Sequence, residues 1–297
     1  MPFFSVIIPL YNKADYISDC IKSVLNQTFE DYEIVIVNDG STDMSVSIVE
    51  TFTSDKIKLF HQKNLGVSIA RNNGASFTKG TYIAFLDADD LWKPNHLMCI
   101  KASIDFLPSA GLYANNYSIK YSTSYTLPAK LDIEIFQSKP IVVNNFFKAS
   151  LNDTLVWTSA TSIKKDKFFD YGMFNINYST GEDLDLWIRI ALKEQIVFNP
   201  ELTMIYDKSI EGSLGKNEDN NVRYILFNSF TEYEDDNIYL KKYLDLKRYG
   251  LALRTKINGE SNIHKNTLKT IDFNNLNFKQ KFLLKTPTFL LQSLNKI

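Results

Sequence analysis

Strand-like and helical segments alternate over the first ninety residues of this 297-residue chain. Apolar, β-branched runs of strand length are separated by segments whose apolar residues recur at helical spacing. The predicted strands cover residues 5–10, 33–38, 57–61 and 81–86, and the predicted helices cover 15–27, 41–53 and 66–77. This alternation indicates right-handed βαβ units, hence an α/β fold whose mostly parallel central sheet is flanked by helices.

The fourth predicted strand runs directly into an acidic loop, Asp87-Ala88-Asp89-Asp90. Open α/β sheets bind ligands at the carboxyl ends of their strands, so Asp87 and Asp89 are candidates to hold a hard cation together with an anionic substrate. The alternative is a solvated turn with an aspartate at a helix start, which needs no metal. Asp90 is expected to cap the next helix. The loop does not match an EF-hand, because Trp92 stands where that loop needs glycine and Met98 where it needs glutamate.

The composition is that of a soluble globular protein, with 44% hydrophobic and 23% charged residues. No apolar run is long enough to span a membrane, and the N-terminal residues lack the features of a signal peptide. We therefore expect a cytoplasmic protein in which Cys20 and Cys99 are reduced thiols on apolar helical faces.

The net charge of -1 conceals a basic tail. Residues 241–297 contain twelve Lys and Arg against three acids, a net charge of +9, so the remaining residues carry -10. Such a tail suggests an anionic partner, although it can also simply neutralise an acidic body. Residues 278–297 form a broken amphipathic pattern that suits peripheral contact with a membrane interface. Packing on the catalytic domain or on a second subunit of a homo-oligomer explains the pattern equally well.

The middle of the chain shows weaker signals. Residues 122–139 are polar and turn-rich, either an acceptor loop or an insertion. The other predictions are helices at 95–106, 140–150, 180–192 and 222–249, strands at 111–121 (with exposed tyrosines), 156–163 and 204–206, and a flexible loop at 209–221.

Five motifs, in order, resemble the signatures of family 2 glycosyltransferases of the bacterial surface-polysaccharide type. They lie at residues 5–12, 37–43, 64–74, 85–90 and 181–187. The resemblance implies a GT-A fold, a nucleotide-sugar donor (a UDP-sugar is favoured), a Mn²⁺ or Mg²⁺ cofactor, and inversion at the anomeric carbon.

The resemblance assigns most of the first four motifs to the donor. Asp39 is placed to accept hydrogen bonds from a base or ribose, and Arg71 suits a diphosphate, with a surface ion pair as the alternative. Tyr11 either faces the base or covers the sheet edge. By resemblance, Asp87 contacts the ribose or the metal, and Asp89 coordinates the metal. The predicted donor-binding residues are Pro9, Tyr11, Asn12, Asp39, Arg71, Asp87, Ala88 and Asp89.

The last motif is expected to carry the chemistry. By resemblance, Asp183 is the catalytic base and Glu182 its orienting or acceptor-binding partner. Trp187 lies one helical turn from Asp183, where its indole can receive an acceptor sugar. The alternative is that the acids only stabilise the helix N-terminus and that Trp187 packs in the core.

The predicted organisation is a GT-A catalytic domain at 1–205, with a nucleotide-sugar half (1–94) and an acceptor half (95–205), followed by a flexible loop and a basic helical extension at 206–297. The expected function is inverting transfer of a sugar to a saccharide or lipid-linked saccharide at the inner face of the plasma membrane, without nucleic acid. A catalytically inactive nucleotide-sugar-binding protein and a sugar nucleotidyltransferase remain alternatives.

Overall fold

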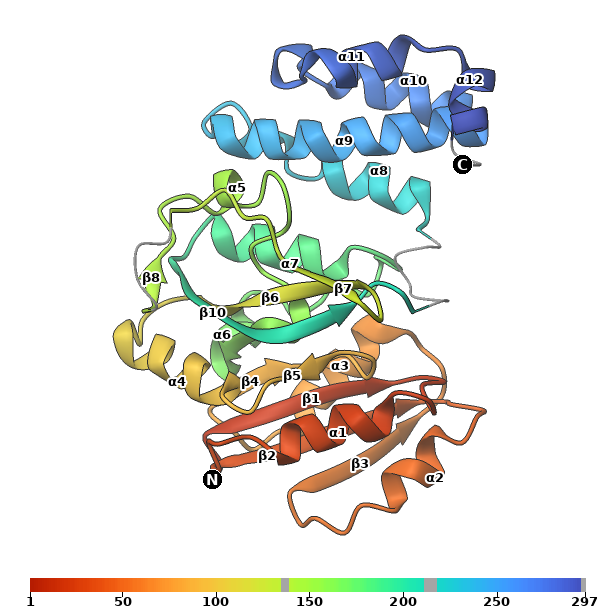
Figure 1. Ribbon diagram of the computed structural model, residues 1–297. Helices are drawn as coiled ribbons and strands as arrows, with labels where there is room; N and C mark the ends of the chain where they lie inside the picture. Colours follow the sequence, from red (N-terminus) through yellow and green to blue (C-terminus); the bar gives the residue numbers. More distant parts are fainter. Residues whose placement is uncertain (135–138, 211–217, 295–297) are drawn as a thin grey trace. The chain divides into compact units, whose positions relative to one another are not determined.

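A computed structural model describes residues 1–134, 139–210 and 218–294 and divides the chain into two compact units, Met1–Glu211 and Gly212–Ile297 (Figure 1). The strands of the first unit are β1 (Phe4–Leu10), β2 (Tyr32–Asp39), β3 (Ile57–Gln62), β4 (Tyr82–Phe85), β5 (Leu91–Trp92), β6 (Leu112–Ser122), β7 (Tyr125–Pro128), β8 (Ile141–Val142), β9 (Thr161–Lys164) and β10 (Ile196–Asp207). Its helices are α1 (Ile17–Leu25), α2 (Ser45–Glu50), α3 (Val67–Phe77), α4 (His96–Phe106), α5 (Phe146–Ala149), the 3-10 turn η1 (Thr158–Ala160), α6 (Lys165–Asp170) and α7 (Glu182–Ala191).

One mixed sheet runs through this unit in the order β3-β2-β1-β4-β9-β6-β10-β5. The pairs among β1 to β4 are parallel, as is β6 with β10. β9 is antiparallel to both β4 and β6, so those two strands share a direction. The carboxyl ends of β1 to β4, β6 and β10 therefore lie along the same edge. The predicted α/β fold with a mostly parallel sheet flanked by helices is confirmed.

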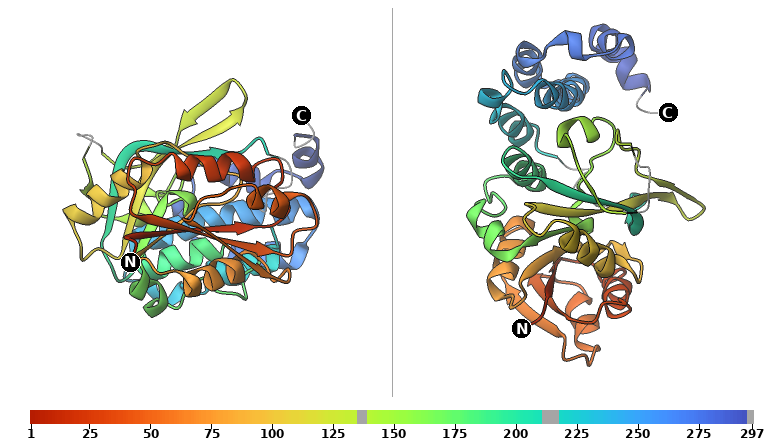
Figure 2. Two further views of the ribbon diagram at one scale, coloured as in Figure 1. Left: turned by 90° about the horizontal axis from the view of Figure 1, so that it is seen from below. Right: turned by 90° about the vertical axis from the view of Figure 1, so that its left-hand side faces the viewer.

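The strand sequences explain why helices cover both faces. Residues of β1 are almost all buried, and they alternate between the two faces. Val6 and Ile8 belong to the core that α1 closes, whereas Ile7 faces α3. Gly74 allows α3 to approach closely, because a Cβ there would lie 2.7 Å from Ile7. Figure 2 shows α1 and α3 on opposite sides of the sheet.

Several predicted elements differ from the structure. Residues 156–163 were expected to form a strand, but they contain η1, and β9 begins only at Thr161. Residues 140–150 were expected to be helical, but they contain β8 and only the single-turn α5. The strand expected at 204–206 is the end of the longer β10, whose register with β6 shifts near Pro200. The tyrosines of β6 were expected to be exposed, yet Tyr113 and Tyr117 are buried and only Tyr121 is exposed. Consecutive residues of β6 from Leu112 to Ile119 are buried, so both faces of the strand are covered over that length.

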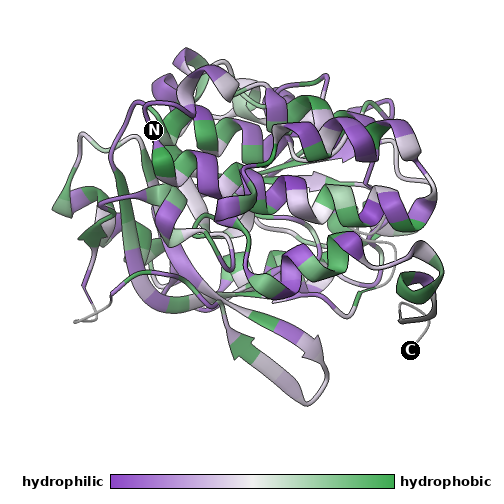
Figure 3. Ribbon diagram, turned by 90° about the horizontal axis from the view of Figure 1, so that it is seen from above, coloured by the Kyte–Doolittle hydropathy of each residue, from purple (hydrophilic) through white to green (hydrophobic). Residues whose placement is uncertain are grey.

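The second unit is helical. Its elements are α8 (Asn220–Asn228), η3 (Thr231–Tyr233), α9 (Ile238–Asn258), α10 (Ser261–Thr270), η4 (Phe273–Asn275), α11 (Phe278–Lys285) and α12 (Thr288–Leu294). Hydrophobic and hydrophilic residues alternate along these helices (Figure 3), and a small core forms around Ala252 of α9 and Leu284 of α11. Residues 211–217, at the centre of the predicted flexible loop, lie outside the described residues.

Candidate active site

The loops that follow β1, β2 and β4 meet at the carboxyl edge of the sheet, where open α/β folds bind their ligands. Asn12, after β1, adopts a left-handed conformation (φ 50°) that asparagine tolerates better than most residues. Its backbone N–H donates to Ser41 Oγ (3.1 Å), and its Oδ1 accepts from the Thr42 N–H (2.8 Å). These bonds join the first loop to the second. Beside them, the ring of Tyr11 is exposed.

Two further predicted donor residues, Pro9 and Ala88, lie near this edge. The pairing of β1 with β4 ends at Ile7, which is paired with Phe85. Pro9 comes two residues later in β1 and therefore has no partner in β4. Ala88 packs in the core and is only 3% exposed.

Asp39, the last residue of β2, shapes the loop before α3. Its Oδ1 accepts hydrogen bonds from Gln62 Nε2 and the Leu65 N–H, both at 2.7 Å, and its Oδ2 accepts from the Gly66 N–H at 2.8 Å. The next residue, Gly40, has a φ of 74°, and a Cβ there would lie 2.8 Å from the Asn64 nitrogen. Only glycine avoids both the unfavourable positive φ and the steric clash.

Arg71 of α3 links the acidic loop to the start of α7. Its Nη2 lies 2.6 Å from Asp87 Oδ1 and its Nη1 lies 2.7 Å from Glu182 Oε1. Burial lowers the pKa of Arg71, but the two carboxylates outweigh that effect and raise it above its usual value. The guanidinium is therefore a buried bridge. It is not the surface ion pair that was the alternative prediction.

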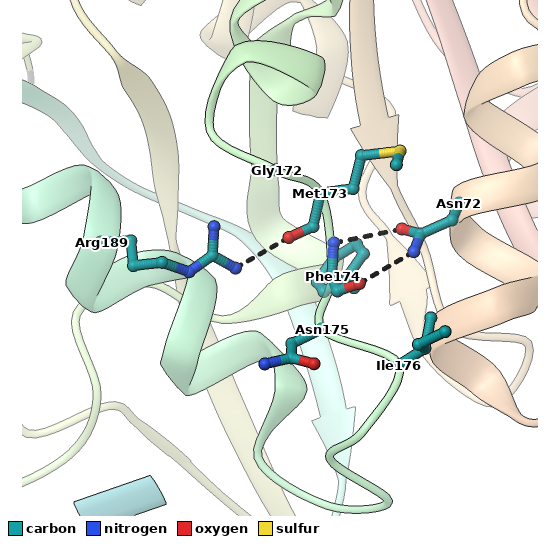
Figure 4. Close-up of a pocket in the computed structure, with 7 residues that line it drawn as sticks. All are labelled: Asn72, Gly172, Met173, Phe174, Asn175, Ile176 and Arg189. Carbon is teal, nitrogen blue, oxygen red and sulfur yellow. Dashed lines mark hydrogen bonds between the residues drawn. The ribbon is translucent and has the colours of Figure 1, made fainter. Parts of the chain in front are cut away.

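A second contact fixes the position of Arg71. The neighbouring Asn72 side chain bonds to both sides of the Phe174 backbone, donating to its carbonyl (2.8 Å) and accepting from its N–H (3.1 Å), as Figure 4 shows. This brace holds the Phe174 ring 5.2 Å from the Arg71 guanidinium carbon. Asn72 and Phe174 also line a small pocket with Ile176 and Arg189 (Figure 4). None of the predicted site residues lines it, so we do not place the site there.

Glu182 and Asp183 open α7 after Gly181, whose left-handed conformation (φ 82°) starts the helix. Glu182 is buried, and burial together with the neighbouring Asp183 raises its pKa, while Arg71 opposes the rise. Asp183 is half-buried, and its Oδ2 accepts a hydrogen bond from Thr158 Oγ1 at 3.2 Å. Among the described residues, Asp183 has no ion-pair partner. Its Oδ1 accepts a hydrogen bond from the Leu184 N–H at 2.7 Å.

Trp187 does not lie where an acceptor sugar can contact it. Its side chain is 1% exposed, and its ring packs near Phe85 and Phe174, with centroids 6.5 and 5.9 Å away. The four-residue spacing does put Asp183 and Trp187 on one side of α7. At Trp187, one helical turn after Asp183, that side of α7 faces the core. The structure therefore supports the alternative prediction, in which Trp187 packs in the core.

The carboxylates of the acidic loop have different surroundings. Asp87 and Asp89 are partly exposed, with side-chain exposures of 29% and 20%, and Asp89 Oδ2 lies 2.6 Å from Lys13 Nζ. Asp90 is buried and accepts a hydrogen bond from Trp157 Nε1 at 3.3 Å. Burial raises the pKa of Asp90, and the charges of Asp87 and Asp89 add to the rise. Asp90 was expected to cap the next helix, but Asn95 holds that position.

A divalent cation fits this loop if a bound nucleotide supplies some of its ligands. Among the residues that the structure describes, no three His, Cys, Asp or Glu side chains are grouped as a metal site made only of protein ligands would need. A Mg²⁺ ion bound with a nucleotide needs only one or two carboxylates, because phosphate oxygens and waters supply the rest. Asp89 and Asp87 meet that lower requirement. Lys13 and Arg71 are the cations that neutralise them here.

The segment Trp157–Ser159 was missed by sequence reasoning. Besides the Trp157 and Thr158 bonds to Asp90 and Asp183, Ser159 Oγ accepts a hydrogen bond from the Asp87 N–H at 3.0 Å. Three consecutive side chains thus contact three different acids of the site. In the sequence, the segment is only an aromatic residue followed by two hydroxyl residues. That pattern is too common to identify these residues as part of the site in advance.

Comparisons with known proteins give one consistent family. The sequence model described as glycosyl transferase family 2 matches residues 5–171. An uncharacterized glycosyltransferase of Rickettsia conorii is 32% identical over 241 residues, which cover 80% of this chain and 38% of that protein. The chondroitin synthase of Pasteurella multocida is 36% identical over 122 residues, 40% of this chain and 13% of that protein. The chain spans between 26% and 42% of the length of the three Rickettsia relatives it matches first.

A solved structure shares the fold. S. aureus TarS 1–349 in complex with UDP-GlcNAc superposes with a TM-score of 0.73 at 20% identity, covering 92% of this chain and 82% of that chain. In the described part of this chain, no helix has the length and hydropathy needed to cross a bilayer.

Proposed function

The chain belongs to glycosyl transferase family 2, and we propose that it moves a sugar with inversion from a nucleoside diphosphate donor, preferably a UDP-sugar, to a hydroxyl group of a saccharide or lipid-linked saccharide. The observation that carries this proposal is the Arg71 bridge between Asp87 and Glu182. It places the donor-side loop and the start of α7 beside each other, as a transfer between two substrates requires. The UDP-GlcNAc bound by the structural neighbour TarS supports a nucleotide-sugar donor.

Asp183 is the proposed catalytic base. It would take the proton from the acceptor hydroxyl as that oxygen attacks the anomeric carbon. Glu182 is buried against Arg71 and positions this end of α7, while Thr158 orients the Asp183 carboxylate. The developing charge on the departing diphosphate would lie at the carboxyl edge of the sheet. A divalent cation held there by Asp89 and Asp87 would supply Lewis-acid stabilisation of that charge.

The acceptor is proposed to approach beside the hairpin of β6 and β7. All four residues of β7 are exposed, and Figure 2 shows the hairpin projecting from its unit. The rings of Tyr121 and Tyr125 lie together at its end, with centroids 5.6 Å apart. Because β6 ends at the same edge as β4, these rings belong to the side of the sheet that carries the acids. The names chondroitin synthase and hyaluronan synthase among the relatives support a saccharide acceptor in polysaccharide synthesis.

The test is an assay of nucleoside diphosphate release with panels of UDP-, GDP- and dTDP-sugars, with Mn²⁺ or Mg²⁺, and with and without saccharide acceptors. Asp183→Asn should lower the acceptor-dependent rate by about 10²- to 10⁴-fold, the usual contribution of a general base, while UDP binding measured by calorimetry stays within about twofold. Asp166→Asn, which removes an exposed acid from the first turn of α6, is the matched control and should retain full activity.

Two outcomes would contradict the assignment. Wild-type turnover by Asp183→Asn would remove Asp183 as the base. UDP-sugar binding without transfer to any acceptor would favour the catalytically inactive binding protein, and formation of a nucleotide-sugar from a sugar phosphate and a nucleoside triphosphate would identify a nucleotidyltransferase.

A further inference from the structure

Lys13 lies inside the proposed donor site although none of the motif assignments includes it. It follows Tyr11 and Asn12 in the loop after β1, and its backbone N–H donates to Ser45 Oγ at 2.8 Å. Its ammonium lies 2.6 Å from Asp89 Oδ2, and the two side chains are 22% and 20% exposed. A lysine from the end of β1 thus crosses to the carboxylate that the family resemblance assigns to the metal.

The surrounding charges explain why a cation belongs there. Asp87, Asp89 and Asp90 lie within four residues, and Arg71 neutralises only Asp87. Without Lys13, the partly exposed carboxylate of Asp89 would face its acidic neighbours with no compensating charge. The phosphates of a nucleoside diphosphate carry the same sign, so they can approach Asp89 only when a cation lies between them.

A divalent cation and the Lys13 ammonium cannot occupy the same position. A cation bound to Asp89 through Oδ2 would lie about 2.1 Å from that oxygen, and the Lys13 ammonium now contacts the same atom. A divalent ion and a unit positive charge held this close repel each other strongly, even where the protein surface screens charges well. The four-carbon stem of lysine is flexible and partly exposed, so the ammonium can move while its backbone stays tied to Ser45.

We propose that Lys13 is the resident cation of Asp89, that a divalent cation displaces it, and that the displaced ammonium then contacts the donor diphosphate. The inference rests on the proposed function. It gives Lys13 two opposing effects: it competes with the divalent cation before the donor binds, and it attracts the diphosphate afterwards. A residue that only holds the loop in shape would change both affinities in the same direction.

Calorimetry on the full chain tests the two effects separately, using Mn²⁺ alone and then UDP in saturating Mn²⁺. Lys13→Met keeps the hydrocarbon stem and removes the charge. We expect it to bind Mn²⁺ alone about tenfold more tightly and UDP about tenfold more weakly, since a hydrogen bond to a charged group is worth roughly that factor or more. Lys13→Arg keeps the charge and should remain near wild type for Mn²⁺.

Controls separate local electrostatics from folding. Lys22→Met removes an exposed lysine of α1 that pairs with Asp19, and both affinities should stay at wild-type values. Lys13→Gln gives the same readout if Lys13→Met is poorly folded in thermal unfolding. Weaker or unchanged Mn²⁺ binding by the charge-removing variants would overturn the inference, as would unchanged UDP binding or a wild-type protein that binds UDP but no Mn²⁺. A wild-type protein that binds no nucleoside diphosphate would instead overturn the proposed function.

Discussion

Both units of the chain bury an arginine between two carboxylates, and the two arrangements serve different purposes. In the first unit, Arg71 joins Asp87 and Glu182. In the second, Arg248 of α9 joins Glu234 and Asp245, with its Nη1 3.0 Å from Glu234 Oε2 and 3.3 Å from Asp245 Oδ1. By local chemistry alone the two sites look alike.

They differ in their access to solvent. Arg248 and Asp245 have no exposed side-chain surface, and Arg248 also donates to the Phe227 carbonyl at 2.6 Å. Lys241 completes this second set by pairing with both of its acids. In the Arg71 set, the Asp87 side chain is 29% exposed, at the strand edge. We call the Arg248 set closed, because the arginine and both of its carboxylates are buried, and the Arg71 set open, because one of its carboxylates is partly exposed. A closed set can only hold helices together, whereas the exposed carboxylate of an open set can exchange its contact for one with a substrate. A buried ion pair is thus weak evidence for an active site unless one of its groups is also exposed to solvent.

Arg248→Met should break the closed set with the largest effect. Removing Arg248 leaves two buried carboxylates to share Lys241, and breaking a buried ion pair costs about 3–5 kcal/mol. We expect the free energy of unfolding, measured by urea titration and circular dichroism, to fall by that amount while UDP binding at native conditions is retained. Arg254→Met removes a more exposed pair with Glu218 and should cost at most about 1 kcal/mol. Equal costs for the two variants would mean that the Arg248 set is not a structural centre.

Arg71→Lys tests whether the open set does more than stabilise. Lysine keeps the charge but lacks the planar fork that reaches two carboxylates at once. We expect the loss of one charged hydrogen bond to lower the free energy of unfolding by about 1.5–3 kcal/mol. Because both Asp87 and Glu182 belong to the proposed active site, freeing either carboxylate should also lower kcat by at least about tenfold.

Arg248→Lys is the matched variant for Arg71→Lys. It should show a similar loss of stability in urea titrations and wild-type kcat. If Arg71→Lys retained wild-type kcat as well, the two sets would have the same structural role, and the contrast between them would fail.

Much of the fold could be predicted because its signals are local. The strands β1, β2 and β4 are short runs rich in apolar residues. Asp39 ends β2 and Asp87 comes just after β4, so the sheet edge that carries these two acids followed from the pattern. The start of α7 was equally legible, because acids precede an amphipathic helix. Where several weak signals overlapped, as at residues 140–150, prediction was wrong.

Partners across the chain could not be predicted. Arg71 and Glu182 are 111 residues apart, and Lys13 and Asp89 are 76 apart. A motif places a residue at the end of an element, but which side chain it meets depends on how elements pack. The same limit explains Trp187, since helical spacing identifies its side of α7 without showing that this side faces the core.

Because the Arg248 set is buried and cannot contact a ligand, any binding role of the second unit must depend on its surface residues. Phe278 and Phe282 of α11 are 86% and 61% exposed and lie one turn apart, while Leu284 packs inward toward α9. Lys279 and Lys285 of the same helix are also exposed. We propose that this face contacts an anionic membrane, where an apolar ring inserts and a basic residue contributes about 1 kcal/mol.

Vesicle sedimentation measures this smallest effect. The double variant Phe278→Ser/Phe282→Ser should bind vesicles rich in anionic lipid at least about tenfold more weakly than wild type, because burying each ring is worth about 1.5–3 kcal/mol at full insertion. Phe106→Ser removes an exposed phenylalanine of α4 in the other unit and should bind as wild type does. If both variants bound equally, the α11 face would not be the membrane contact. Stability of the double variant should be unchanged, because neither ring belongs to the core that Leu284 and Ala252 form, and a loss of stability would place these rings in the structural part of the unit.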